Sequence, residues 1–91
     1  MSAAPDRKLA LEICALDRPP YHFEAARVTL PSVMGLFTVL PRHAPIITQL
    51  EIGVLQATFT NGETHRFAVN GGIAKVEKDQ VLVVTETAEM D

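Results

Sequence analysis

Hydrophobic and polar residues alternate over short stretches of this chain, and Pro, Gly or Asn separates one stretch from the next. In the segment 8–16 the alternation is that of a β-strand with one face in water. No segment keeps the 3.6-residue period of an amphipathic helix for long enough to predict one. Further strands are expected over residues 21–23, 26–30, 34–40, 44–50, 54–60, 63–69, 73–77 and 80–85. The pattern predicts an all-β fold, a two-sheet β-sandwich or flattened barrel of about ten short strands.

Four groups of turn-forming residues are expected to end strands. Pro19 and Pro20 close the segment 17–20 and cannot donate hydrogen bonds to a sheet. Reversals of direction are expected at 41–43 and at 51–53. The adjacent glycines of the segment 70–72 allow backbone geometry that other residues avoid. We therefore expect the chain to break there, with a bulge or a close approach of two backbones.

The strongest local signal is Asn61-Gly62 between two apolar-rich segments, which is typical of a β-hairpin. A two-residue loop would scatter the large apolar side chains over both faces of the hairpin. If Gly62 is instead the left-handed residue of a three-residue loop with a bulge, Leu55 faces Phe67 and one face becomes mainly apolar. We therefore predict the bulged hairpin.

The C-terminal part is predicted to contain one more hairpin, around Lys78-Asp79. Its last strand is apolar at every position from 81 to 84, so both of its faces should be covered, one of them by a partner. The segment 86–91 has three acidic residues and no anchoring pattern. We expect a domain over 8–86, a flexible N-terminus at 1–7, a frayed acidic tail at 87–91 and no C-terminal helical domain.

Composition narrows the classes of function. The chain has 91 residues, of which 47% are hydrophobic and 21% charged, and this suits one soluble globular domain. The net charge of −3, from 8 Lys and Arg against 11 Asp and Glu, leaves no basic stripe for nucleic acid. The N-terminus does not resemble a secretion signal, and no run approaches the ~18 apolar residues that cross a bilayer. We expect neither a nucleic-acid partner nor direct insertion into a membrane.

The candidates for acid-base or metal chemistry are the three histidines and the single cysteine. His43 has no carboxylate in its own loop, so a turn histidine bonded to backbone is favoured over a catalytic one. His65 is expected to have a cross-strand or surface role, and His22 is interpreted as a strand residue. Cys14 has no disulfide partner and no zinc-like spacing, and is interpreted as a half-buried hydrophobic residue. We expect no catalytic residue, no metal and no cofactor.

Residues 35–48 carry a longer motif, Gly-Leu-Phe-Thr-Val-Leu-Pro-Arg-His-Ala-Pro-Ile-Ile-Thr. Its core, Leu-Pro-x-His-Ala-Pro, together with the Val-Asn-Gly-Gly step at 69–72, resembles the signature of ATP synthase epsilon subunits. The segments 9–13, 26–31, 50–55 and 81–88 resemble further strands of that family. The resemblance covers residues 8–88.

This resemblance implies a sandwich of two five-stranded sheets on the rotor of an F-type ATP synthase, bound to the foot of the gamma subunit and to the ring of c subunits. Such a subunit couples proton flow to ATP synthesis without being a catalyst, on the cytoplasmic side of a bacterial plasma membrane. By position, the c-ring contact loop comprises Ser32, Val33, Met34, Gly35, Leu36, Phe37 and Thr38. The expected gamma contacts are Arg42, His43, Thr48, Val81 and Val83. The expected structural positions are Pro41, Pro45, Gly62, Gly71 and Gly72.

The chain departs from the family pattern at three positions of the motif. Leu36 replaces the usual acid, Thr38 the second glycine and Arg42 the glycine before the histidine. A hydrophobic contact with the ring is therefore expected in place of a salt bridge. The family normally continues into a two-helix hairpin. The sequence does not distinguish a natural short form from a truncated chain. The alternative functions are a free-standing β-sandwich adaptor without a synthase and, third, an enzyme with a site around His43 or His65.

Overall fold

The computed structural model describes residues 8–91, which form seven β-strands and no helix. The strands are β1 (Leu9–Ala15), β2 (Arg18–Ser32), β3 (Gly35–Val39), β4 (Ile46–Phe59), β5 (Thr64–Glu77), β6 (Gln80–Thr85) and β7 (Ala88–Met90). They are hydrogen-bonded in the order β1-β6-β5-β4-β2-β3, with β7 beside β5. Because β1 also pairs with β2, the sheet closes into a flattened barrel. The predicted all-β class is confirmed.

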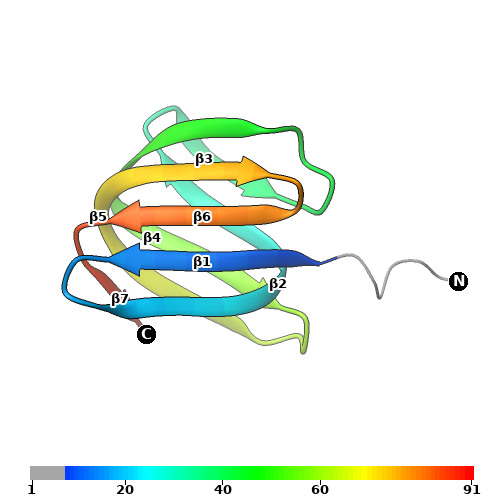
Figure 1. Cartoon of the computed structure of the whole chain (residues 1–91), viewed down its shortest axis with the longest axis horizontal. Coiled ribbons are helices and arrows are strands. Elements are labelled where there is room, and N and C mark those ends of the chain that lie inside the picture. Colours follow the sequence, from blue (N-terminus) through cyan, green and yellow to red (C-terminus); the bar gives the residue numbers. More distant parts are fainter. Residues whose placement is uncertain (1–7) are drawn as a thin grey trace, which may run out of the picture.

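Three long strands, β2, β4 and β5, run through both layers of the barrel (Figure 1). The start of β4 pairs with the end of β5, with Leu50 opposite Gly72, whereas the end of β4 pairs with the start of β5. One layer contains β1 and β6 with the start of β2, the start of β4 and the end of β5. The other contains β3 and β7 with the remaining parts of the long strands. The short strands expected from the sequence are therefore present as segments of fewer, longer strands.

Residues that were expected to interrupt the chain instead lie inside continuous strands. Gly53 lies within β4, and Gly71 and Gly72 lie within β5 with φ angles of 75° and 111°. A glycine can bend a strand without ending its hydrogen-bond ladder, so the predicted reversal at 51–53 and break of the chain at 70–72 are wrong. The close approach of two backbones predicted at 70–72 is confirmed, because a Cβ on Gly72 would lie 1.9 Å from the Val84 carbonyl oxygen. Pro19 and Pro20 open β2 beside an irregularity in its register with β1, where the absence of an N–H is tolerated.

The hairpin between β4 and β5 has the predicted bulged register. The Phe59 N–H donates to the Glu63 carbonyl at 2.7 Å, and the Gly62 N–H donates to the Phe59 carbonyl at 2.9 Å. Gly62 has a φ of 93°, and Leu55 lies opposite Phe67 with both side chains buried. The three-residue loop is favoured over a two-residue loop because it places the apolar residues on one face of the hairpin.

The hydrophobic core lies between the two layers. The Phe67 ring is at its centre, with ring centroid distances of 5.2 Å to Tyr21 and 5.8 Å to Phe23. The other large side chains that are fully buried are Leu9, Leu11, Ile13, Val28, Leu30, Val39, Leu55, Val76, Val81 and Val83. Each such side chain contributes about 1.5–3 kcal/mol relative to an exposed position. Within residues 8–91, no buried side-chain nitrogen or oxygen is without a hydrogen-bond partner.

The C-terminal segment is anchored, in contrast to the frayed tail predicted over 87–91. The Thr85 hydroxyl donates to the Thr87 carbonyl at 3.2 Å, and the Asp91 N–H donates to the Arg66 carbonyl at 2.8 Å. Ala88 is buried, and Ala88–Met90 pairs with β5 as β7. These hydrogen bonds are made by backbone groups and by the Thr85 hydroxyl. The acidic side chains on which the prediction of a frayed tail was based take no part in them. The flexible N-terminus predicted at 1–7 lies outside the described residues.

Candidate functional site

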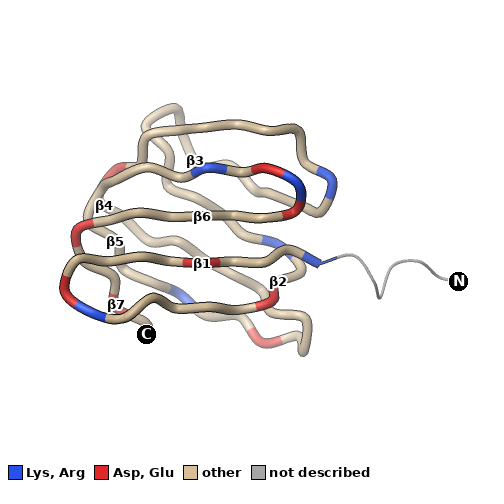
Figure 2. The backbone as a smooth tube through the Cα atoms, in the orientation of Figure 1, with Lys and Arg blue, Asp and Glu red and all other residues tan. Residues whose placement is uncertain are grey.

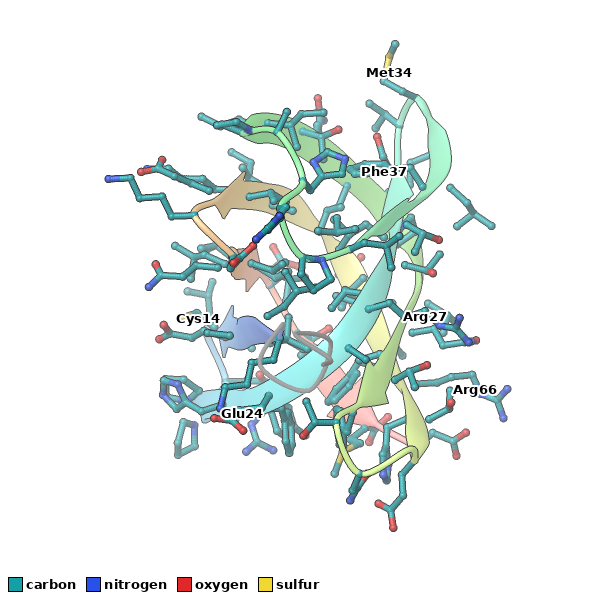
Figure 3. All side chains as sticks on the ribbon, turned by 90° about the vertical axis from the view of Figure 1, so that its right-hand side faces the viewer. Cys14, Glu24, Arg27, Met34, Phe37 and Arg66 are labelled. Carbon is teal, nitrogen blue, oxygen red and sulfur yellow. The ribbon has the colours of Figure 1, made fainter. Side chains whose placement is uncertain are left out.

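The predicted c-ring contact loop, 32–38, is a β-hairpin tip: it comprises the last residue of β2, the two-residue turn Val33-Met34 and the first four residues of β3. It projects from the barrel, and Figure 3 shows Met34 at its tip. The Val33 N–H donates to the Gln49 carbonyl at 2.9 Å, which fastens the base of the loop to β4. Gly35 allows the tight turn with a φ of 115°. Beyond this base, Met34 is 88% exposed and Leu36 is 73% exposed. The loop therefore holds two large apolar side chains in water at a fixed position.

Two residues predicted as partner contacts lie beneath the loop instead. Ser32 is 3% exposed, and its hydroxyl lies 2.7 Å from the hydroxyl of the buried Thr48. The Ser32 hydroxyl also accepts a hydrogen bond from the Met34 N–H at 3.0 Å. Ser32 and Thr48 therefore shape the loop and do not present a surface of their own. Thr38 is exposed, and its hydroxyl lies 2.9 Å from that of Thr29.

The turn that contains His43 packs against this loop. The His43 N–H donates to the Leu40 carbonyl at 3.1 Å, and its ring centroid lies 6.2 Å from that of Phe37. Its Nδ1 lies 2.6 Å from the Ala44 carbonyl, and because a carbonyl only accepts, Nδ1 carries the proton. The predicted turn histidine bonded to backbone is confirmed. The flanking Pro41 is half-buried and Pro45 is exposed.

The predicted gamma contacts Val81 and Val83 are buried in the core, on the inner face of β6. Val84 is exposed and Leu82 is half-buried on the outer face. Because all four residues are apolar, they show no alternation of apolar and polar positions. The sequence therefore does not indicate which pair faces outward. The prediction therefore selects the wrong face of this strand.

Sequence reasoning also missed a group of exposed apolar side chains, the outer strip, formed by Leu16, Ile47, Ile73 and Val84. Val84 lies opposite Ile73 on β5, whereas Ile47 lies two residues before Gln49, the partner of Ile73 on β4, so the strip crosses the strands diagonally. An open groove of about 330 Å³ runs beside it, lined by Leu16, Asn70, Gly72, Ile73, Val84, Thr85 and Glu86. The strip becomes visible only from the registers that join β4, β5 and β6.

A cluster of polar side chains lies on the outer surface of the other layer. The Arg27 guanidinium donates to the Thr58 hydroxyl at 3.3 Å, and that hydroxyl lies 3.2 Å from the one of Thr64 on the next strand. Figure 3 shows Arg27 and Arg66 on this face and Cys14 on the opposite one. The same layer also exposes the apolar side chains of Ile52 and Val54, so its outer surface is mixed.

The cysteine and the remaining histidine form no reactive cluster. Burial, then the hydrogen bond to Glu12 and the charge of Glu12, raise the pKa of the Cys14 thiol, so the nucleophilic thiolate is disfavoured. His22 Nε2 lies 3.9 Å from the same Glu12 carboxylate on an exposed surface. Within residues 8–91 no group of three or more His, Cys, Asp or Glu is arranged to hold a metal ion. The same part of the chain has no helix long and apolar enough to span a membrane.

His65 has the surface role expected from the sequence, in a cluster that makes stability depend on pH. Its ring stacks on Phe59 with centroids 4.7 Å apart, and its Nε2 lies 3.1 Å from a Glu63 carboxylate oxygen. Hydrogen bonds from His65 and then from Asn61 lower the pKa of Glu63. Ionised Glu63 therefore stabilises the fold above its unfolded pKa of about 4.3, and this contribution is lost as pH falls through the lower folded pKa.

We expect Glu63→Gln to be less stable than the wild type near neutral pH, and the difference to shrink as the solution is acidified. The effect is small because the carboxylate is exposed. Urea denaturation midpoints measured from about pH 6 to about pH 3 test this. Glu51→Gln, which removes an exposed carboxylate on β4, serves as the control. A constant difference between Glu63→Gln and wild type over this range would contradict the assignment.

Residues 8–91 match the family model of the ATP synthase, Delta/Epsilon chain, beta-sandwich domain. The chain is 41% identical over 81 residues to the ATP synthase epsilon chain of Moorella thermoacetica. It is 40% identical over 82 residues to the ATP synthase epsilon chain of Prochlorococcus marinus strain MIT 9303. The alignments cover 89% and 90% of this chain but 60% and 61% of the relatives, so the chain spans about three fifths of their length.

Solved structures with the same fold come from ATP synthases. One is a chain in the cryo-EM structure of the Euglena gracilis mitochondrial ATP synthase, OSCP/F1/c-ring, with a TM-score of 0.85 and 23% identity over 92% of this chain and 54% of that one. Another is in the central stalk/c-ring structure of the Tetrahymena thermophila mitochondrial ATP synthase, with a TM-score of 0.75 and 16% identity over 91% and 66%. At these identities the likeness concerns the fold alone. The family match and the curated relatives confirm the resemblance seen in the sequence: the chain belongs to the delta/epsilon family of ATP synthase chains through its beta-sandwich domain.

Proposed function

We propose that this chain is the epsilon subunit on the rotor of a proton-translocating F-type ATP synthase, where it binds the gamma subunit and the c-ring. It couples proton flow to ATP synthesis by surface contacts and takes no part in the chemistry. It lies peripherally on the cytoplasmic side of a bacterial plasma membrane. The observation that carries this proposal is the loop tip, where Met34 and Leu36 are exposed on a base fixed to β4.

The loop tip suits a contact with the c-ring for two physical reasons. Exposed apolar surface is unfavourable in water by about 25 cal/mol per Å², so burying Met34, Leu36 and the partly exposed Val33 against a partner is favourable. The hydrogen bonds beneath the tip already hold its backbone, so docking orders few additional groups. An apolar contact also fits the absence of an acid at position 36.

The gamma contact is assigned to His43, Arg42 and the outer strip. The strip supplies an apolar centre in Ile47, Ile73 and Val84, and the exposed Arg42 and half-buried His43 supply polar groups. An apolar centre with a polar rim is the usual composition of a specific protein interface. Ile47 takes the place of the buried Thr48, which the sequence had indicated.

Co-purification with the gamma subunit of the same synthase tests this function. We expect the two folded proteins to elute as one complex in size-exclusion chromatography. Ile47→Asp should weaken that complex, because it puts a carboxylate at the apolar centre of the contact. Ile52→Asp is the matched control: Ile47 and Ile52 lie on the same strand and are 69% and 79% exposed, but Ile52 pairs with Asn70 in the other layer.

The outcomes separate the parts of the proposal. A wild-type chain that is folded but does not associate with folded gamma would remove the proposed function. A complex that is weakened equally by both variants would instead show that gamma does not bind the face that contains the outer strip.

A further inference from the structure

Three residues other than glycine have a left-handed backbone within residues 8–91, namely Arg42, Lys78 and Asp79, with φ angles of 70°, 51° and 61°. This conformation is unfavourable for a residue with a Cβ, and glycine is its usual occupant. Positive φ at Lys78 and Asp79 is the ordinary geometry of a type I′ turn, since the two residues join the paired Glu77 and Gln80. Arg42 is the third residue of the turn closed by the hydrogen bond from the His43 N–H to the Leu40 carbonyl, a position that glycine usually occupies. Two of the three residues carry a long cationic side chain.

The two turns are held together by Asp79. Its carboxylate accepts a hydrogen bond from the Arg42 N–H at 2.6 Å, and its carbonyl accepts one from the Ala10 N–H at 2.9 Å. The turn at 40–45 and the turn between β5 and β6 are therefore fastened side by side at the start of β1. Figure 2 shows a basic segment on each of these turns at the end of the barrel where β1 begins. Arg42 and Lys78 thus form one unit, the basic turn pair.

Asp79 places one carboxylate between the two cations, so the three residues together carry one net positive charge. Lys8, Arg66 and Lys75 each lie within 4.0 Å of a carboxylate oxygen, the Arg27 guanidinium donates to Thr58, and Arg18 lies over the Tyr21 ring. Arg42 and Lys78 are exposed and have no such side-chain contact with residues 8–91. They are the two cations of this part of the chain that remain available to a partner.

We infer that the basic turn pair binds an acidic segment of the gamma subunit beside His43, so that this contact depends on charge as well as on apolar burial. The inference rests on the proposed function and adds the chemistry of the partner surface. An Arg guanidinium binds a carboxylate through two parallel hydrogen bonds, and the neighbouring Lys ammonium adds a second positive charge. On a chain with a net charge of −3, such a local pair sets the orientation in which an acidic partner approaches.

The decisive variant is Arg42→Gly, because it separates folding from binding. Glycine adopts a φ of 70° without a Cβ, and its N–H still donates to Asp79, so the thermal midpoint should stay the same or rise. Its affinity for gamma should fall roughly fivefold to tenfold at low salt, and this loss should shrink in high salt. Lys78→Asn, which tolerates the left-handed backbone, should weaken binding in the same salt-dependent way.

Isothermal titration of the full chain with purified gamma, at about 50 mM and about 500 mM salt, measures these changes. Arg66→Gln is the control, since it removes one positive charge from the opposite outer face, and it should leave the affinity unchanged (Figure 3). If wild type binds gamma and both turn variants bind equally well, the inference is overturned while the proposed function stands. If wild type does not bind gamma, the proposed function itself fails.

Discussion

Replacing Gly72 with alanine is expected to lower the free energy of unfolding by about 3 kcal/mol or more. A Cβ at this position would lie 1.9 Å from the Val84 carbonyl oxygen and 2.9 Å from the Thr85 Cα, and these backbone atoms cannot rotate away. The φ of 111° adds backbone strain for any residue with a side chain. For a domain of this size the thermal midpoint should fall by roughly 12–24 °C. Thermal and urea denaturation measure the loss.

Gly62→Ala provides the matched control for this variant. Gly62 also has a positive φ, 93°, but no heavy atom lies within 4 Å of the position that a Cβ would take. Only backbone strain of about 1–2 kcal/mol is expected there. The difference in stability loss between the two variants therefore measures the steric cost of the close approach between β5 and β6. Equal losses of stability would show that this approach is not tight.

Met34→Asp is expected to abolish most of the coupling of ATP synthesis to proton flow. Met34 is 88% exposed and projects from the loop tip, so the variant should fold with a stability within about 0.5 kcal/mol of wild type. An unpaired carboxylate buried against the c-ring should weaken the contact by roughly 3 kcal/mol, about a hundredfold in affinity. Gradient-driven ATP synthesis in membranes that carry the variant measures the effect.

Met90→Asp makes the same exchange at a partly exposed methionine of β7, away from the loop. We expect membranes with this control variant to synthesise ATP like wild type. Undiminished synthesis with Met34→Asp would show that the loop is not the ring contact. Phe37→Asp is a poorer test, because the Phe37 ring packs on His43 and its loss would disturb the neighbouring turn.

The sequence predicted the fold best where local and global requirements agree. The bulged register at Gly62 follows because only that loop places Leu55 opposite Phe67 on an apolar face. Glycines at 53, 71 and 72 were interpreted as ends of strands, but a bend inside a continuous strand needs the same residue. Whether a glycine ends or bends a strand depends on the partner strands, which are distant in sequence.

The sequence indicated the residues of the candidate site but not their arrangement. The loop 32–38 and the turn of His43 were indicated separately, and the fold brings them together, with Met34 and Leu36 exposed. The burial of Val81 and Val83 was not predictable, because an unbroken apolar strand gives no alternation from which to read its inner face. The outer strip was missed for a related reason, since it joins single residues of four different segments.

The continuity of β2, β4 and β5 through both layers has a mechanical consequence. In a sandwich of two separate sheets, only side-chain contacts resist the sliding of one sheet over the other. Here, sliding one layer past the other would also have to distort the backbone of three continuous strands and their hydrogen bonds. The two layers are therefore fixed to one another by main chain as well as by the core between them.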